Sequence, residues 1–299
     1  MRRIGILGPS SLKAAGARWP AFFSGLRDLG YVEGKNLVIE SRWAEGKYER
    51  LPELVAELVR LKVEVIVTHT STSALAAKQA TTSIPIVFAA LGDAQAAGVV
   101  DNLARPGGNI TGLSLFSPEV SAKRIELAME ALPRAKRIAF LANGNNVSLK
   151  ATLSQALERT AKSLKVAVQR IEVKDSKEIE PAIATVGKQG FDAFVIEDDP
   201  LLLGNSAAIA IHSVRHKIPA IAAVEFADAG GLVGFGADFP AMFQRAATYV
   251  DKILKGAKPG DLPVERASKF ELVINQSTAK ALGIKMPQSM LLRADRVIE

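Results

Sequence analysis

A hydroxyl-rich loop after a short apolar run carries side chains suited to binding an anion. Residues 63–67 are mostly β-branched and predict a buried strand. One hydroxyl would be enough to cap the helix expected over 74–80, and such a cap is worth about 1 kcal/mol. The loop offers five hydroxyls, on Thr68, Thr70, Ser71, Thr72 and Ser73. We therefore expect Thr70, Ser71 and Thr72 to bind a carboxylate or another anion, with capping alone as the alternative interpretation.

A second polar loop follows the next expected strand, at 84–88. It holds Asp93, whose carboxylate would either cap a turn or pair with the ammonium group of an amino-acid ligand. Three acids later in the chain, Asp198, Asp199 and Glu225, are rival partners for that ammonium. Asp199 stands directly before a proline, and capping of a helix is the alternative explanation for it.

Serine, asparagine and aromatic side chains near other strand ends complete the expected ligand site. They are Ser10 and Ser11, Asn143 and Asn146, and the rings of Trp19 and Phe235. Asparagine also suits tight turns for conformational reasons. Trp19 is the stronger candidate for stacking on a ligand ring, whereas a residue such as Phe235 is more often part of a core.

The chain contains no recognisable catalytic or cofactor motif. The sequence lacks a phosphate-binding loop, the nucleophile-elbow motif of hydrolases and a dinucleotide-binding fingerprint. We therefore expect neither catalysis nor a cofactor. The absence of cysteine excludes disulfides, thiolate nucleophiles and cysteine-bound zinc. His69 stands alone in the hydroxyl loop. His212 and His216 are four residues apart on an expected helix, a spacing that can bind metal, but no third ligand is evident and we expect no metal site.

Strands and single helices alternate along most of the chain, which indicates an α/β fold with parallel sheets and right-handed crossovers. The pattern occurs twice. A strand ending at Thr68 is followed by a helix and by Ile-Pro at 84–85, and a strand ending at Glu197 is followed by a helix and by Ile-Pro at 218–219. We therefore expect two Rossmann-like lobes whose strand ends, with the candidate residues, face one cleft.

Charge and composition narrow the class of protein. The 299 residues carry a net charge of +7, but lysine and arginine are scattered among acids, so we expect no nucleic-acid partner. No segment approaches the roughly 18 apolar residues of a transmembrane helix. Residues 1–9 start with basic side chains yet fit a first strand better than an export signal. Either the protein is cytosolic, or a signal lies outside this sequence.

Several longer segments resemble one family of ABC transporter substrate-binding proteins. They are GLRDLGYVEGKN at 25–36, ESRWAEG at 40–46, LARPGGNITG at 103–112, AGGL at 229–232, ATYVDKILKG at 247–256 and KFELVIN at 269–275. The resemblance spans nearly the whole chain. It implies the fold of type I periplasmic binding proteins, with three crossovers between the lobes, and a link to aromatic amino acids.

The resemblance also implies lobe boundaries and a role. The N-terminal lobe would hold 1–114 plus 238–264, and the C-terminal lobe 115–237 plus 265–299. We expect a monomeric, periplasmic solute-binding component of an ABC importer. It would close by a hinge on a small carboxylate-bearing ligand, an amino acid and in particular an aromatic one, and then engage an ABC permease. A cytosolic ligand sensor on the same fold is the alternative, and a two-domain α/β enzyme is less favoured.

Overall fold

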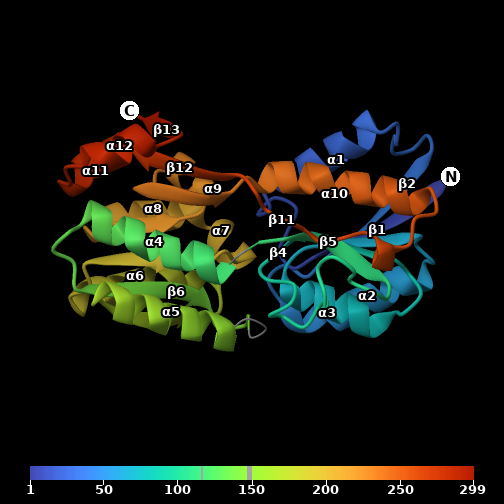
Figure 1. Cartoon of the computed structure of the whole chain (residues 1–299), viewed down its shortest axis with the longest axis horizontal. Coiled ribbons are helices and arrows are strands. Elements are labelled where there is room, and N and C mark those ends of the chain that lie inside the picture. The colour runs from blue at the N-terminus through green and yellow to red at the C-terminus, as the bar shows by residue number, and fades with distance from the viewer. Residues whose placement is uncertain (116, 147–149) are drawn as a thin grey trace. The chain divides into compact units, whose positions relative to one another are not determined.

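The residues that the computed structural model describes, 1–115, 117–146 and 150–299, form two units, each built around a mainly parallel sheet (Figure 1). Unit 1 holds residues 1–115 and 239–267. Unit 2 holds residues 117–146, 150–238 and 268–299. The C-terminal stretch is thus shared, with its first part in unit 1 and its last part in unit 2. Among the described residues, no helix is long and apolar enough to span a membrane.

Unit 1 contains a six-stranded, fully parallel sheet in the order β11-β5-β4-β3-β1-β2. The strands are β1 (Arg2–Gly8), β2 (Leu37–Trp43), β3 (Val65–Thr68), β4 (Ile86–Leu91), β5 (Ile110–Ser114) and β11 (Glu265–Arg266). Every residue of β3, β4 and β5 is buried. Continuous apolar runs, rather than alternation, are typical of parallel strands covered on both faces.

Two pairs of helices cover this sheet. Helices α1 (Arg18–Asp28) and α10 (Phe239–Leu254) pack side by side on one face, and α2 (Leu51–Arg60) and α3 (Ser71–Ala80) pack on the other (Figure 1). On α1 the buried side chains of Trp19, Phe22 and Leu26 recur at helical spacing, and this spacing turns one apolar face to the sheet. The single-turn helices η1 (Tyr48–Arg50) and η3 (Pro259–Asp261) lie in connections.

Unit 2 contains a seven-stranded sheet in the order β13-β12-β10-β9-β8-β6-β7. The strands are β6 (Arg137–Asn143), β7 (Ala167–Val173), β8 (Ala193–Ile196), β9 (Ala220–Ala222), β10 (Val233–Ala237), β12 (Phe270–Asn275) and β13 (Arg296–Ile298). All neighbours are parallel except β10 and β12, which run antiparallel with Val233 opposite Ile274.

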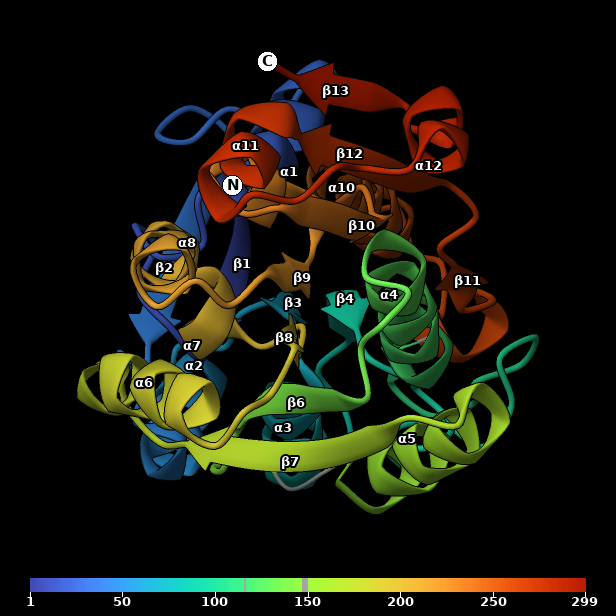
Figure 2. The same cartoon turned by 90° about the vertical axis from the view of Figure 1, so that its left-hand side faces the viewer.

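Helices also cover both faces of the sheet in unit 2. Helices α4 (Ser117–Ala131) and α5 (Lys150–Leu164) lie on one face, and α6 (Ile179–Lys188) and α8 (Ser206–Arg215) lie on the other (Figure 2). The shorter elements are α7 (Pro200–Leu203), α9 (Val224–Asp228), α11 (Gln276–Leu282), α12 (Gln288–Arg293) and η2 (Ser176–Glu178).

The repeat seen in the sequence has a structural counterpart in the two Ile-Pro pairs. The Ile66 amide donates to the carbonyl of Pro85 at 2.9 Å, and the Phe194 amide donates to that of Pro219 at 3.0 Å. In both units the proline precedes the strand instead of opening it, so β4 starts at Ile86 and β9 at Ala220. Proline has no N–H to donate to a neighbouring strand, which is consistent with its place just before the first residue of each strand.

The predicted α/β fold with parallel sheets is confirmed, but some element bounds differ. The strand expected at 230–236 begins only at Val233, because Gly230 adopts φ of 98° in the turn after α9. A Cβ at Gly231 would come within 2.1 Å of the Phe226 ring, so this turn requires glycine there. The short strands β11 and β13 were missed, since two or three residues show no periodicity.

Candidate ligand-binding site

The start of α3 in unit 1 combines a helix N-terminus with an unusual backbone. Thr70 is the N-cap residue and has φ of 70° and ψ of 148°. A β-branched residue rarely adopts positive φ, and such a conformation costs about 1–3 kcal/mol. The hydroxyl oxygen of Thr70 accepts from the Ser73 amide at 3.4 Å and donates to the Ser73 hydroxyl at 3.1 Å, while the Thr70 amide donates to the Ala90 carbonyl of β4 at 3.1 Å. Strain of this kind is typical of functional loops.

The structure gives the five hydroxyls of this loop three different surroundings. Thr68 donates to the Leu7 carbonyl at 2.8 Å and so ties β3 to β1. Thr70 and Ser73 form the helix cap, as the capping interpretation requires. Ser71 is buried in the first turn of α3, and the Thr72 hydroxyl oxygen is buried without a hydrogen-bond partner among the described residues. Capping therefore does not account for Thr72.

A buried aromatic cluster adjoins this loop. The Trp19 ring centroid lies 5.7 Å from that of His69, 5.7 Å from that of Trp43 and 5.1 Å from that of Phe243. Among the described residues, the indole nitrogen of Trp19 and both ring nitrogens of His69 are buried without a hydrogen-bond partner. Trp19 is thus surrounded by protein side chains, and ligand stacking on its ring stays a prediction.

The positive charge of Arg18 and the N-terminus of α3 both lie near this cluster. Burial, and secondly the charge of Arg18, lower the pKa of His69 to about 3, so the ring is neutral at physiological pH. The Arg18 guanidinium is itself buried and lies 4.9 Å from the centroid of the Phe239 ring. The first turn of α3 adds the partial positive charge of a helix N-terminus. The sequence analysis missed Arg18, although a charged residue beside an apolar helical stripe was a signal that could have revealed it.

Three other predicted site residues of unit 1 lie in loops at strand ends. Ser10 is buried after β1, and its hydroxyl lies 3.5 Å from the Ser11 carbonyl. The Ser11 hydroxyl accepts from the Ala14 amide at 3.1 Å, which makes it part of a turn. One Asp93 oxygen, Oδ1, accepts from the amides of Gln95 at 3.1 Å and Ala96 at 3.0 Å. The turn-capping role considered for Asp93 is present, and its contact with a ligand stays a prediction.

In unit 2, the predicted asparagines belong to a network at the ends of β6 and β8. The Asn143 side chain donates to Asp199 Oδ1 at 2.9 Å, and that of Asn146 donates to Asp199 Oδ2 at 3.3 Å. The Asn143 amide donates to Glu197 Oε2 at 3.0 Å. Asp199 also accepts from the Leu201 amide at 2.9 Å and so caps α7, the role that its place before a proline suggested.

Glu197 is the acid of this network that the sequence analysis did not select. Burial, and next the charge of Asp199, raise the pKa of the Glu197 carboxyl to about 8, against the opposing influence of Arg170. One guanidinium nitrogen of Arg170 lies 3.9 Å from Glu197 Oε2. A carboxyl group that is protonated has an O–H and can donate as well as accept a hydrogen bond.

Two of the remaining predicted residues of unit 2, Asp198 and Phe235, have partners within that unit. Asp198 forms a buried ion pair with Arg124, whose Nη1 lies 2.8 Å from Asp198 Oδ1. The charge of Asp198 is thus balanced by a residue of α4, and pairing with a ligand ammonium stays a prediction. Phe235 stacks on Phe270 with ring centroids 6.1 Å apart, while Glu225 is half-buried in the first turn of α9. Nothing in the sequence near Asp198 pointed to Arg124.

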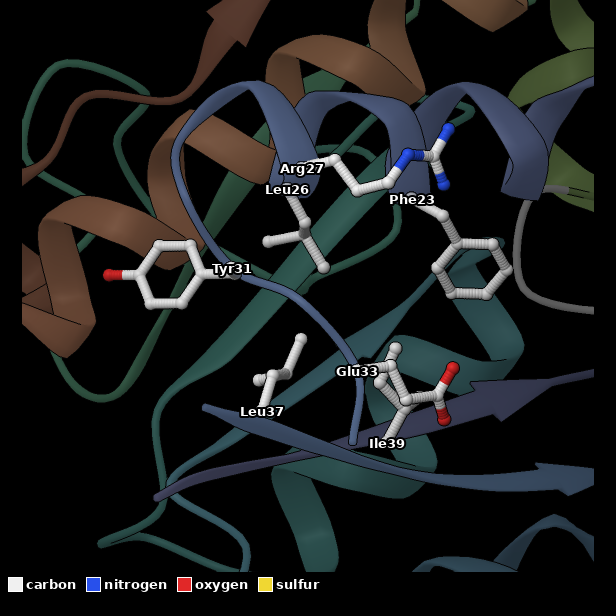
Figure 3. Close-up of a pocket in the computed structure, with 7 residues that line it drawn as sticks. All are labelled: Phe23, Leu26, Arg27, Tyr31, Glu33, Leu37 and Ile39. Carbon is white, nitrogen blue, oxygen red and sulfur yellow. The ribbon is translucent and has the colours of Figure 1, made fainter. Parts of the chain in front are cut away.

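A pocket of about 150 Å³ lies elsewhere in unit 1, between α1 and β2 (Figure 3). Leu26 points from the helix toward Leu37 on the strand, and Arg27 is also among the residues that line the pocket. None of the residues predicted to bind ligand lines this pocket. The candidate site therefore rests on the start of α3 and the adjoining aromatic cluster.

Comparisons with known proteins bear on the family and the fold of the chain. A family model described as ABC transporter substrate binding protein matches residues 4–298. A tyrosine-binding protein of Clostridioides difficile (strain R20291) is 30% identical over 266 residues, covering 88% of this chain and 76% of that protein. The structure of an ABC domain with L-Trp from Streptococcus pneumonia is 26% identical, with a TM-score of 0.90 and 99% of both chains covered. A conserved domain protein of Vibrio cholerae is 28% identical, with a TM-score of 0.92 and the same coverage.

The chain belongs to the ABC transporter substrate-binding protein family, whose members are solute-binding proteins and not enzymes. Its fold is that of type I periplasmic binding proteins. The family and the fold class predicted from the sequence are thereby confirmed. The individual contact residues remain predictions.

Proposed function

We propose that the protein is the solute-binding component of an ABC importer, works outside the cytoplasmic membrane, and passes its ligand to a membrane permease. The ligand we propose is a small carboxylate-bearing molecule, above all an aromatic amino acid. One observation carries the proposal: buried polar atoms without hydrogen-bond partners, on Trp19, His69 and Thr72, gather around the start of α3 among the described residues. Because such atoms are rare in folded proteins, a ligand that pairs with them is the simplest explanation.

The chemistry at the start of α3 suits a carboxylate. The amides of the first helical turn and the Thr72 hydroxyl can donate to its oxygens, and the helix dipole and the Arg18 charge favour an anion there. A neutral His69 can donate or accept through either ring nitrogen. The relatives support the ligand class, since one is named a tyrosine-binding protein and another was solved with L-Trp.

The ammonium group of an amino-acid ligand needs an acid, and we propose Asp93 for this role. Asp93 follows β4, the strand next to β3, so it lies at the same edge of the sheet as the start of α3. Its Oδ1 caps the following turn, and a carboxylate oxygen can accept more than one hydrogen bond. Asp198 is the weaker candidate, because Arg124 already balances its charge.

From the sequence resemblance alone, we also propose that ligand favours a closed form of the protein, which the permease recognises. A ligand shifts such an equilibrium only through the extra contacts that it makes in the closed form. Small-angle X-ray scattering with and without saturating ligand tests this step. A smaller radius of gyration with ligand is expected, and an unchanged radius would contradict closure.

Isothermal titration calorimetry tests the ligand class. The protein is unfolded, dialysed and refolded to remove bound ligand, then titrated with L-tryptophan, L-tyrosine, L-phenylalanine and benzoate. We expect at least one of these acids to bind at one molecule per chain, and no binding by any of them would overturn the proposal. Replacing Thr72 with valine keeps the side-chain shape but removes the hydroxyl, and should weaken binding about tenfold or more, as expected for a hydrogen bond to a charged group.

A matched control is available on α5. The Thr160 hydroxyl donates to a backbone carbonyl of its own helix, that of Ala156, at 2.9 Å. Thr160→Val therefore makes the same chemical change outside the proposed site and should leave affinity unchanged. Equal loss of affinity in both variants would show that Thr72 acts on stability and not on the ligand.

A further inference from the structure

Three potential metal ligands lie close together on two neighbouring helices of unit 2. His212 and His216 lie one helical turn apart on α8, and Glu180 lies on the neighbouring helix α6, on the same side of the sheet (Figure 2). One candidate ligand atom from each of the three side chains lies within 4.8 Å of the other two. The sequence analysis found no third ligand for the histidine pair because Glu180 is distant in the sequence, and the structure places Glu180 beside the pair.

One ring nitrogen of each histidine is free to bind an ion, as far as the described part of the chain shows. His212 Nδ1 and His216 Nε2 are buried and have no hydrogen-bond partner among the described residues. His212 Nδ1 lies 3.4 Å from Glu180 Oε1, a distance compatible with shared coordination of one ion. Both histidines are half-buried, so their rings are held by packing, whereas Glu180 is exposed and can adjust its position.

One cation already touches the carboxylate. Arg215 Nη1 lies 2.9 Å from Glu180 Oε1. Both side chains are more than half exposed, and exposed ion pairs of this kind contribute little to stability. A divalent ion held by three ligands would therefore displace Arg215 at small cost.

We propose that His212, His216 and Glu180 form a binding site for a divalent transition-metal ion, with zinc as the type case. Two imidazoles four residues apart on a helix, with a carboxylate from a second element, are a ligand set that zinc, nickel and copper accept and that calcium and magnesium do not favour. The three ligands leave a fourth position of a tetrahedral ion open to water or to a partner's side chain. Because the ligands come from α6 and α8, the ion would link these helices and stabilise unit 2.

The test uses untagged protein treated with a chelator and titrated with zinc chloride by calorimetry. We expect one ion per chain, with no comparable heat from calcium or magnesium chloride. His212→Gln and His216→Gln should each weaken zinc binding by more than the roughly 10–100-fold that the loss of an outer-shell partner costs, since each removes one of three direct ligands. Glu180→Gln should weaken it at least about tenfold, and because this residue is exposed, its loss of affinity cannot be attributed to misfolding.

Two further variants serve as controls. Glu158 is exposed on α5 in the same unit, and Glu158→Gln should leave zinc affinity unchanged. Arg215→Gln removes the competing cation and should leave the affinity equal or higher. Wild-type protein that binds no zinc, or histidine variants that bind zinc as well as wild type, would overturn the proposal.

Discussion

His69 makes a testable contribution to the pH dependence of unit 1. Its pKa falls from 6.5 to about 3 on folding, because the ring is buried and Arg18 adds positive charge nearby. Below about pH 6.5 the unfolded chain binds a proton at this ring and the folded chain does not, so stability is present above 6.5 and is lost as the pH falls toward 3. Each pH unit in this window removes about 1.4 kcal/mol of unfolding free energy, so about pH 4.5 corresponds to a loss of about 2.7 kcal/mol.

Replacing His69 with phenylalanine keeps an aromatic ring beside Trp19 and Phe243 and removes the titrating group. Wild type and variant are unfolded in urea at about pH 7.5 and about pH 4.5, and the difference between the two proteins is compared at the two pH values. The effect of the substitution on packing is the same at both pH values. All other titrating groups are the same in both proteins. Both contributions therefore cancel in this comparison. We expect the relative stability of the variant to rise by about 2–3 kcal/mol at the lower pH.

The natural probe for this experiment is tryptophan fluorescence. The chain contains two tryptophans, and both Trp19 and Trp43 lie in unit 1, with Trp19 in contact with His69. The signal therefore reports on the unit that contains the perturbation, even if the two units unfold in separate steps. A relative stability that does not change between the two pH values would refute the reasoning, because it would mean that the His69 ring protonates as readily in the folded protein as in the unfolded one.

Two more predictions concern the buried charges of unit 2, read by circular dichroism during urea unfolding. Folding raises the pKa of Glu197, whereas it lowers that of His69, so the two groups have opposite effects on the pH dependence of stability. The stabilisation from Glu197 is present below pH 4.5 and is lost as the pH rises through about 8. Glu197→Gln should therefore flatten the decline in stability that wild type shows between these values, and a decline of unchanged slope would show that another group causes it. Arg124→Met should cost about 3–5 kcal/mol by leaving Asp198 buried without its partner. Adding Asp198→Asn should recover part of that cost, and a double variant no more stable than the single one would contradict the charge argument.

The sequence was informative where local patterns decide the structure. Buried β-branched runs identified β3 and β4, and the helical spacing of Trp19, Phe22 and Leu26 identified α1. The hydroxyl loop was correctly placed at the start of a helix, because serine and threonine have a local reason to stand there. The alternation of strands and helices then predicts a parallel sheet, with the polar loops at the carboxyl ends of its strands.

The sequence was uninformative where contacts join distant segments. Arg124 on α4 pairs with Asp198 after β8, and Glu180 on α6 lies beside His212 on α8. No local sequence pattern indicates either contact. The positive φ of Thr70 was equally hidden, since a β-branched residue would not be expected in that conformation. Which hydroxyls cap the helix and which stay unpartnered among the described residues depended on that geometry.

The central claim is that the start of α3 receives a carboxylate, and a calorimetric comparison of an acid with its amide tests it most directly. Refolded protein is titrated with the tightest acid of the panel, for example L-tryptophan, and with the corresponding amide, which keeps the ring and the ammonium group but lacks the negative charge. We predict that the amide binds at least about 100-fold more weakly, because the helix dipole, the Arg18 charge and the donors at Thr72 all favour an anion. Equal affinity for acid and amide would contradict the claim.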